Sequence, residues 1–264
     1  MRTMLEVEIT RIDVSKGERK RTRDLVAEEK TLYVFLNRSH YATILCTPSN
    51  LKELAVGHVL SEGIAKSIDE INKIEMNEEE GSCRIRLKET VDLEKRLSLA
   101  KRFARVFISA CGTRELYAPV PRLKKIGSTV EVRAETILDC VKRLNSVAET
   151  YRKTGGVHVA AIYRNNGTLV AFAEDVGRHN AVDKAIGAVS LHKTRFDQCF
   201  LALSGRLTGD IVFKAARVGL PIVASLSAAI DSGIDLAREV DLTLVGFARG
   251  RYMNVYTSPQ RILT

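Results

Sequence analysis

Cys111 is the residue in this sequence best suited to covalent chemistry. It follows a short apolar run and precedes residues 112–130, which contain Gly and Pro and show little periodicity. Such a stretch predicts a long loop of the functional or mobile kind. Nearby positive charge would favour the nucleophilic thiolate, and three arginines lie close in the sequence: Arg102, Arg105 and Arg114. The alternative is an inert, buried cysteine, and position alone does not decide between the two.

The other cysteines give no sign of a disulfide framework or a zinc site. The sequence has five cysteines, an odd number, and they are widely spaced, unlike the pattern of a disulfide-stabilised secreted domain. No two lie close enough in sequence to form the usual paired zinc ligands. Three of them lie in apolar runs and are predicted to be structural, namely Cys46, Cys140 and Cys199. Cys83 remains undecided.

A dense polar segment covers residues 174–184, EDVGRHNAVDK, where a predicted strand ends and a predicted helix begins. Open α/β sheets bind ligands at this kind of edge, and a helix N-terminus favours phosphate. A solvated loop would not need so many polar side chains beside two apolar elements. We therefore take Asp175, Arg178 and His179 as candidate ligand-binding residues.

Two further segments repeat this arrangement. Ser204, Gly205 and Arg206 follow the next predicted strand; glycine permits close backbone approach, and the arginine fork suits phosphate. The segment lacks the Gly-Lys-Ser/Thr ending of a Walker loop. His158 stands at the start of another predicted strand. A lone histidine is more often structural than catalytic, so His158 is a candidate only in company with the other segments.

The third segment lies near the C-terminus and places two guanidinium groups between two aromatic rings. It consists of Phe247, Ala248, Arg249, Gly250, Arg251 and Tyr252. Such a pairing could stack a base and hold its phosphates. Each segment alone is a weak signal. Three of them at successive strand ends, in a protein of net charge +9, predict an anionic, nucleotide-like ligand.

The elements that carry these residues differ between the two halves of the chain. In the first half we expect an α+β part with strands at 31–36, 41–46, 73–76, 83–87 and 106–108 and helices at 51–63 and 93–103. No helix or strand is predicted for residues 1–30. In the second half we expect helices at 135–153, 180–190, 209–218 and 232–239 and strands at 157–163, 168–174, 199–204, 222–226, 242–247 and 253–257. A hairpin followed by β-α-β units predicts an α/β fold with a mixed sheet and helices on both faces. We place the division into two parts at 1–128 and 129–264.

Composition excludes some classes of protein. No apolar run is long enough to span a bilayer, and residues 1–10 lack the apolar core of a signal peptide. A cytoplasmic protein without membrane contact is expected. A basic cluster early in the chain leaves nucleic-acid binding as a less favoured alternative, because few aromatic residues lie near it. It comprises Lys16, Arg19, Lys20, Arg21 and Arg23.

Several segments together resemble a known family. They are residues 174–184 (EDVGRHNAVDK), 154–161 (TGGVHVAA), 204–206 (SGR), 244–257 (LVGFARGRYMNVYT), 60–64 (LSEGI) and 109–112 (SACG). From about residue 30 to its end, the sequence resembles the formate dehydrogenase accessory sulfurtransferase (FdhD) family. This resemblance implies a cytidine-deaminase-like second half. The deaminase zinc site is missing, since Val159 and Ala160 follow His158 and no P-C-x-x-C occurs, so no metal site is expected.

The resemblance also implies an activity. Members take a persulfide sulfur from a cysteine desulfurase and deliver it to the bis-guanine-dinucleotide form of a molybdenum or tungsten pterin cofactor before formate dehydrogenase receives that cofactor. They bind a GDP-like nucleotide and form homodimers. Cys111 would carry the persulfide, and the three polar segments with His158 would bind the cofactor.

The sequence departs from the family pattern in two places. Arg114 stands where the family commonly has the second cysteine of a C-x-x-C pair, so Cys111 would receive and deliver sulfur alone. Residues 227–232, SAAIDS, replace an S-A-P-T-like segment. The first departure supports an alternative function, a non-catalytic chaperone that binds the same cofactor.

Overall fold

The structure is a computed structural model that describes residues 2–104 and 123–264. The predicted strand at 106–108, Cys111, Arg114 and most of the predicted loop at 112–130 lie outside the described residues. The predictions made for them therefore stand as made.

A six-stranded mixed sheet forms the centre of the second half, in the order β13-β12-β11-β10-β8-β9. Its strands are β8 (His158–Arg164), β9 (Leu169–Asp175), β10 (Cys199–Leu203), β11 (Ile222–Ser225), β12 (Thr243–Arg249) and β13 (Tyr252–Thr257). The pairs β10–β11 and β11–β12 are parallel, whereas β8–β9, β8–β10 and β12–β13 are antiparallel. The predicted hairpin and β-α-β order are confirmed.

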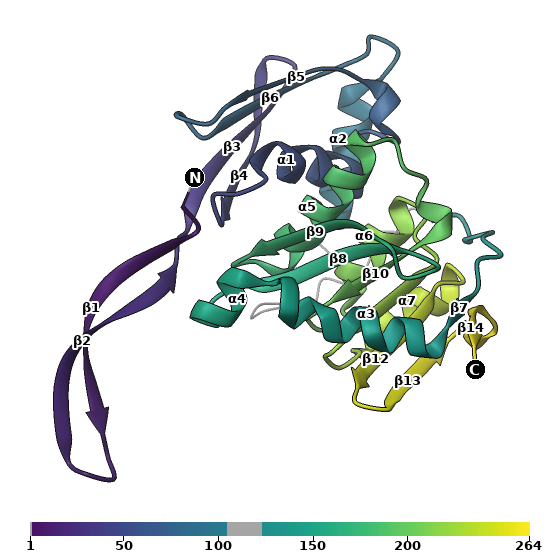
Figure 1. Ribbon diagram of the computed structural model, residues 1–264. Coiled ribbons are helices and arrows are strands. Elements are labelled where there is room, and N and C mark those ends of the chain that lie inside the picture. Colours follow the sequence, from purple (N-terminus) through teal and green to yellow (C-terminus); the bar gives the residue numbers. More distant parts are fainter. Residues whose placement is uncertain (1, 105–122) are drawn as a thin grey trace.

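Helices cover both faces of this sheet (Figure 1). Alternate residues of a strand point to opposite faces, and β8 shows which helices lie on each. Ala160 and Ile162 join the core formed with α5 (Arg178–Leu191), α6 (Gly209–Arg217) and α7 (Asp231–Glu239). Ala161 and Tyr163 join the core formed with α3 (Ala134–Val147). The predicted α/β class, with a mixed sheet between two helical layers, is confirmed.

The first half folds as an α+β part around a four-stranded sheet of order β4-β3-β6-β5. Its elements are β3 (Lys30–Leu36), β4 (Ser39–Cys46), α1 (Leu51–Ser61), β5 (Ile71–Asn77), β6 (Ser82–Leu87) and α2 (Leu93–Ala104). Short pieces complete the chain: β7 (Val132–Arg133) pairs with β14 (Ile262–Leu263), and 3₁₀ turns occur at Ile68–Glu70, Phe196–Gln198 and Pro259–Arg261. One core cluster contains buried residues of both halves. The boundary at 128/129 stays a prediction.

Helices α1 and α5 touch backbone to backbone where Gly57 meets Gly187. A Cβ atom added at Gly57 would lie 1.7 Å from the carbonyl oxygen of Asp183, and one at Gly187 would lie 1.9 Å from that of Glu53. Neither position has room for a side chain. This contact holds the first half firmly against the helical layer of the second.

The prediction of a single helix at 135–153 is wrong. The chain leaves helical geometry at Ala148, whose ψ is 92°, and α4 (Glu149–Thr154) starts anew. The carboxylate of Glu174 accepts hydrogen bonds from the N–H groups of Thr150 and Tyr151, at 3.2 and 2.7 Å. Such a carboxylate satisfies the free donors of a helix start. The break thus depends on a residue on β9 that the helical pattern does not reveal.

A two-stranded ribbon missed by the sequence pattern projects from the body (Figure 1). It consists of β1 (Met4–Asp13) and β2 (Glu18–Ala27). Side chains on both faces are mostly exposed, so alternation between apolar and polar residues is weak. The strand register places Arg19, Arg21 and Arg23 on one face of the ribbon. The basic cluster is therefore presented on an extended arm.

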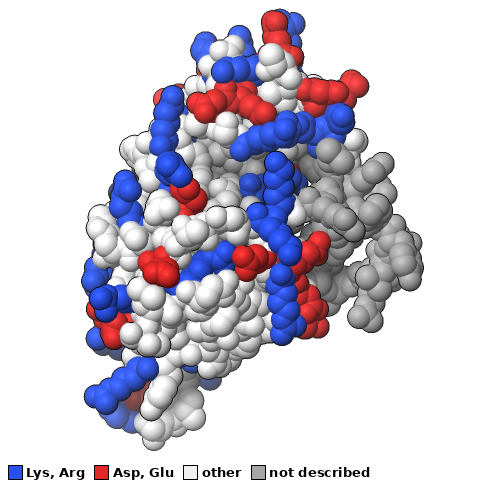
Figure 2. Space-filling model, turned by 90° about the vertical axis from the view of Figure 1, so that its right-hand side faces the viewer, with Lys and Arg blue, Asp and Glu red and all other residues white. Residues whose placement is uncertain are grey.

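One face of the molecule carries mixed charge. Figure 2 shows one face of the molecule, on which Lys and Arg side chains are interspersed with Asp and Glu side chains. On this face the excess positive charge does not form one continuous basic patch. In the described residues, no helix combines the length and apolar character needed to cross a membrane.

Candidate functional site

All the predicted ligand-binding segments in the described residues meet at one edge of the six-stranded sheet. Strands β9 to β12 end at this edge, while β8 and β13 begin there, as the pairing directions require. His158 at the start of β8 pairs with Asp175 at the end of β9, and Ser204 directly follows β10. The sheet topology therefore brings together segments that are far apart in sequence.

His158, Arg178 and the 204–206 segment form one half of the site. His158 Nδ1 lies 3.4 Å from the hydroxyl of Ser204, which accepts a hydrogen bond from the Val159 N–H at 3.0 Å. A Cβ atom added at Gly205 would lie 3.2 Å from Arg178 Cβ and 3.7 Å from His158 Nδ1. A side chain at position 205 would therefore push these groups apart.

The charge on this half of the site is positive, although His158 itself is held neutral. Burial, and then the charge of Arg178, lower the pKa of His158 below its usual value. His179 and Arg206 also lower this pKa, whereas the Asp175 carboxylate raises it. Arg206 is exposed. A cluster of this kind favours an anionic group such as phosphate.

Arg178 has a donor that the described protein does not satisfy. Its Nε is buried without a hydrogen-bond partner among residues 2–104 and 123–264. One of its terminal nitrogens lies 3.8 Å from a carboxylate oxygen of Asp210. Buried polar atoms in native proteins are usually paired, so an orphaned guanidinium donor at this edge calls for an acceptor from elsewhere.

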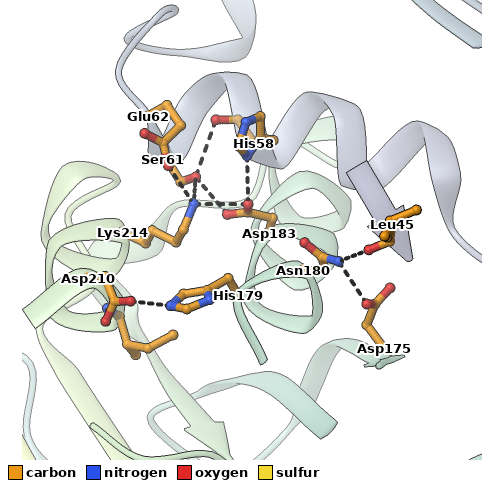
Figure 3. A network of polar contacts seen from close by, with 11 residues as sticks. Leu45, His58, Ser61, Glu62, Asp175, His179, Asn180, Asp183, Asp210 and Lys214 are labelled. Atoms are coloured by element: carbon orange, nitrogen blue, oxygen red, sulfur yellow. Dashed lines mark hydrogen bonds and ion pairs between the residues drawn. The ribbon is translucent and has the colours of Figure 1, made fainter. Parts of the chain in front are cut away.

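The structure gives the Asp175 carboxylate protein partners, whereas the sequence analysis selected it as a ligand-binding residue. Both its carboxylate and the Lys184 ammonium are completely buried and 2.7 Å apart. It also accepts hydrogen bonds from the N–H groups of Thr47 (3.1 Å) and Gly177 (2.9 Å) and from Asn180 Nδ2 (2.9 Å). These four donors fill its acceptor positions. Direct ligand contact by Asp175 is therefore not supported; it fixes the first turn of α5, which carries Arg178 and His179 (Figure 3).

Residues 247–252 form the other half of the site, where β12 turns into β13. The pairing of these strands is irregular between Gly246 and Arg249, and Phe247 has a φ of 50°. An aromatic residue in the left-handed region is uncommon and strained, and such strain and such bulges concentrate at functional sites. This backbone geometry agrees with the prediction that residues 247–252 bind a ligand.

The aromatic and arginine side chains of this half are accessible. Phe247 is 40% exposed and Tyr252 82% exposed. Arg249 Nε donates to the carbonyl oxygen of Leu226 at 2.6 Å, which places its guanidinium 5.5 Å from the Phe247 ring centroid. Strands β12 and β8 are three strand spacings apart, about 14 Å. An extended ligand could reach both halves.

Comparison with known proteins places the chain in a family. The model of the FdhD/NarQ family matches residues 27–263.

The chain belongs to this family.

Curated FdhD relatives cover nearly the whole chain. A sulfur carrier protein FdhD from Shouchella clausii is 36% identical over 252 residues, which cover 93% of this chain and 92% of that protein. Another from Sulfolobus acidocaldarius is 36% identical over 263 residues, covering 97% and 99%. The crystal structure of a candidate formate dehydrogenase accessory protein from Desulfotalea psychrophila superposes with a TM-score of 0.80 at 25% identity, covering 99% of this chain and 100% of the other.

Four of the five cysteines of this FdhD-family chain are buried and free: Cys46, Cys83, Cys140 and Cys199. Burial raises the pKa of Cys46 to about 12, and those of Cys83 and Cys140 to about 11. It also raises the pKa of Cys199. These thiols carry little thiolate at neutral pH and are inert. Cys83, left undecided by the sequence, joins the structural group.

We expect these four cysteines to resist alkylation in the folded FdhD-family chain. Iodoacetamide reacts with thiolate. Burial keeps these thiols protonated and also prevents the reagent from reaching them. Peptide mass spectrometry after brief labelling at neutral pH should find them unmodified, while labelling in denaturant modifies all four. Rapid labelling of any one of them in the folded protein would contradict its structural assignment.

The structure also shows charged residues close to the site that the sequence pattern did not single out. Lys214 lies in the middle of the apolar stretch of α6, and Asp183 and Lys184 lie in the otherwise apolar α5. All three are buried. Charged residues at buried helical positions are the one available signal, because such groups are almost never buried unless paired. Asp210, which contacts both His179 and Arg178, was also missed.

No resident metal site emerges from the part of the chain that is described. Within residues 2–104 and 123–264, no three His, Cys, Asp or Glu side chains are grouped to hold a metal ion. The group within hydrogen-bond distance of His158 Nδ1 among these residues is the Ser204 hydroxyl, and Asp175 is already paired with Lys184. The donor set therefore differs from that of a zinc deaminase.

Proposed function

We propose that this chain is a sulfur carrier that receives a persulfide sulfur from a cysteine desulfurase on Cys111. It passes this sulfur to the bis-guanine-dinucleotide pterin cofactor, with molybdenum or tungsten, that formate dehydrogenase or a related enzyme uses. Its FdhD relatives are named sulfur carrier proteins. Sulfur carriage needs a reactive thiol, and the observation that carries the proposal is the burial of every other cysteine.

The loading step is a thiol exchange. The Cys111 thiolate attacks the terminal sulfur of the desulfurase persulfide, the S–S bond of that persulfide breaks, and the desulfurase thiolate leaves. Cys111 then carries one additional sulfur as Cys–S–SH. One thiolate is sufficient for this step, so Arg114 in the place of a second cysteine does not prevent it.

The sheet edge supports the docking of the cargo. Its basic half offers Arg178, with an unpaired buried donor, and Arg206 for phosphate groups. The other half offers the exposed rings of Phe247 and Tyr252 for stacking. A guanine dinucleotide combines both kinds of group, and the distance between the halves suits an extended ligand.

The test is intact-mass spectrometry after incubation with a cysteine desulfurase and free cysteine. We expect a mass gain of one sulfur atom, mapped by peptide analysis to Cys111 and reversed by a thiol reductant. The four buried cysteines serve as internal controls and should remain unmodified. A reaction without desulfurase sets the background.

The main alternative is a chaperone that binds the same cofactor without carrying sulfur. It predicts no mass gain while GDP still binds, and that result would replace our proposal. Nucleic-acid binding through the β1–β2 arm is a second alternative. Acidic side chains interrupt the arm, with Glu6 paired to Arg23 at 3.0 Å and Asp24 to Arg11 at 3.8 Å. The nucleic-acid alternative predicts that the protein binds an oligonucleotide with an affinity that falls steeply as salt concentration rises.

A further inference from the structure

Helices α5 and α6 are joined by two polar contacts, one helical turn apart. His179 and Asp183 lie four residues apart on α5, as do Asp210 and Lys214 on α6, so each pair shares one face of its helix. His179 contacts Asp210, and Asp183 pairs with Lys214 at 3.0 Å (Figure 3). We call these the outer and inner contacts, because His179 is 34% exposed whereas Asp183 is buried.

The inner contact fixes the two helices to α1. Lys214 Nζ donates to Ser61 Oγ at 3.0 Å and pairs with Glu62 at 2.8 Å. Asp183 accepts a hydrogen bond from Ser61 at 2.6 Å, and His58 Nδ1 lies 3.1 Å from it. Although burial opposes it, the charge of Lys214 lowers the pKa of Asp183 to about 2. The inner contact is a satisfied, charged network that leaves little freedom in the spacing of α5 and α6.

The outer contact determines which nitrogen of His179 carries a proton. Burial would raise the pKa of Asp210, but hydrogen bonds with His179 and Thr208 and the charge of Arg178 hold it below its usual range. Asp210 is thus an ionised carboxylate, which only accepts hydrogen bonds. His179 Nε2 must therefore carry the proton that it donates to Asp210. Neutral His179 then has an unprotonated Nδ1.

This Nδ1 has no hydrogen-bond partner in the described ranges. The ring is partly exposed at the sheet edge, near His158 and Arg178. Figure 3 shows the second ring nitrogen pointing away from Asp210. An acceptor nitrogen thus lies among the cationic groups that favour phosphate. That combination fits a ligand with an anionic group and an N–H or O–H donor close to it.

We propose that Asp210 is a positioning residue that holds His179 with its proton on Nε2, and that Nδ1 accepts a hydrogen bond from a nucleotide at the sheet edge. The donor would be a ribose hydroxyl or a base N–H beside the phosphates. This rests on the proposed nucleotide site and adds a specific contact to it. It assigns a role to two residues on the surface where α5 and α6 meet.

The first test is independent of any ligand. The imidazole ¹⁵N signals of His179, assigned by their loss in His179→Gln, should show a protonated Nε2 and a free Nδ1 at mildly alkaline pH. In Asp210→Asn the amide can either donate or accept, so both tautomers should appear. The matched control is Asp231→Asn, in the first turn of α7, which should leave the signals unchanged. A wild-type Nδ1–H tautomer, or an unchanged single tautomer in Asp210→Asn, would overturn the proposal.

The second test measures GDP affinity by calorimetry. His179→Gln should weaken binding about tenfold, the loss of roughly one good hydrogen bond. Asp210→Asn should weaken it about twofold, because the tautomer with an unprotonated Nδ1 is still partly populated. The double variant should lose no more affinity than His179→Gln alone, because both changes act through the same contact. Unchanged affinity in Asp210→Asn, with GDP bound by the wild type, would contradict the contact. If the wild type binds no GDP, the proposed nucleotide site is contradicted. The tautomer measurement still tests the role of Asp210, because it needs no ligand.

Discussion

Replacement of Cys111 by alanine is expected to abolish sulfur uptake and activation of the client enzyme. The remaining cysteines are buried and have raised pKa values, so none can substitute as the nucleophile. GDP affinity should stay the same, because the residues proposed to bind the nucleotide lie at the sheet edge. Intact mass after reaction with desulfurase and client activity after cofactor transfer measure the two effects.

Cys199→Ala is the matched control for this prediction. It also removes one thiol, but a buried one on β10, and should retain full sulfur uptake once the protein is folded. Sulfur uptake that persists in Cys111→Ala would show that another group carries it. Loss of GDP binding in that variant would show that docking and transfer are not separate.

Replacement of Lys184 by methionine is expected to lower the free energy of unfolding by about 3–5 kcal/mol, since it leaves a buried carboxylate without its countercharge. The Lys184 ammonium and the Asp175 carboxylate are both fully buried. Lys184 also donates to the carbonyl oxygens of Thr47 and Glu174, at 2.9 and 3.1 Å. Methionine fills a similar volume but satisfies none of these acceptors. Urea unfolding, followed by circular dichroism, measures the change.

Two further variants separate the charge effect from lost packing. Asp175→Asn combined with Lys184→Met removes both charges and should recover part of the lost stability. Lys153→Met removes an exposed lysine of α4 whose partner is Glu149, and exposed ion pairs contribute little. A Lys184→Met variant as stable as Lys153→Met would contradict the importance of the buried pair.

The sequence indicated which segments lie together at the sheet edge better than it indicated the contacts among their side chains. Strand-end segments can be recognised because polar residues and glycines interrupt apolar runs, and the sheet then brings their ends together. Some partners of Lys184 and Lys214 come from α1 and its flanking residues, more than a hundred residues away in sequence, among them Thr47 and Ser61. No local pattern encodes such pairs, so neither lysine was chosen and Asp175 was taken for a ligand residue.

The errors in the predicted fold have two physical origins. The break at Ala148 depends on Glu174 from β9, a contact outside the reach of helical periodicity. The β1–β2 arm was missed because a ribbon exposed on both faces does not need alternating apolar residues. By contrast, β10 and β11 of the central sheet lie in apolar runs, and these strands were predicted closely.

The contact of Gly57 with Gly187 limits how this protein can move. Domain closure by shear requires a layer of side chains that can repack as one helix slides over another. Here the two backbones meet directly, so sliding α1 along α5 would drive carbonyl groups into α-carbons. Within the described ranges, the two halves should therefore move as one rigid body. Under the proposed function, a desulfurase and a client enzyme would then approach a surface that is already formed in this part of the protein.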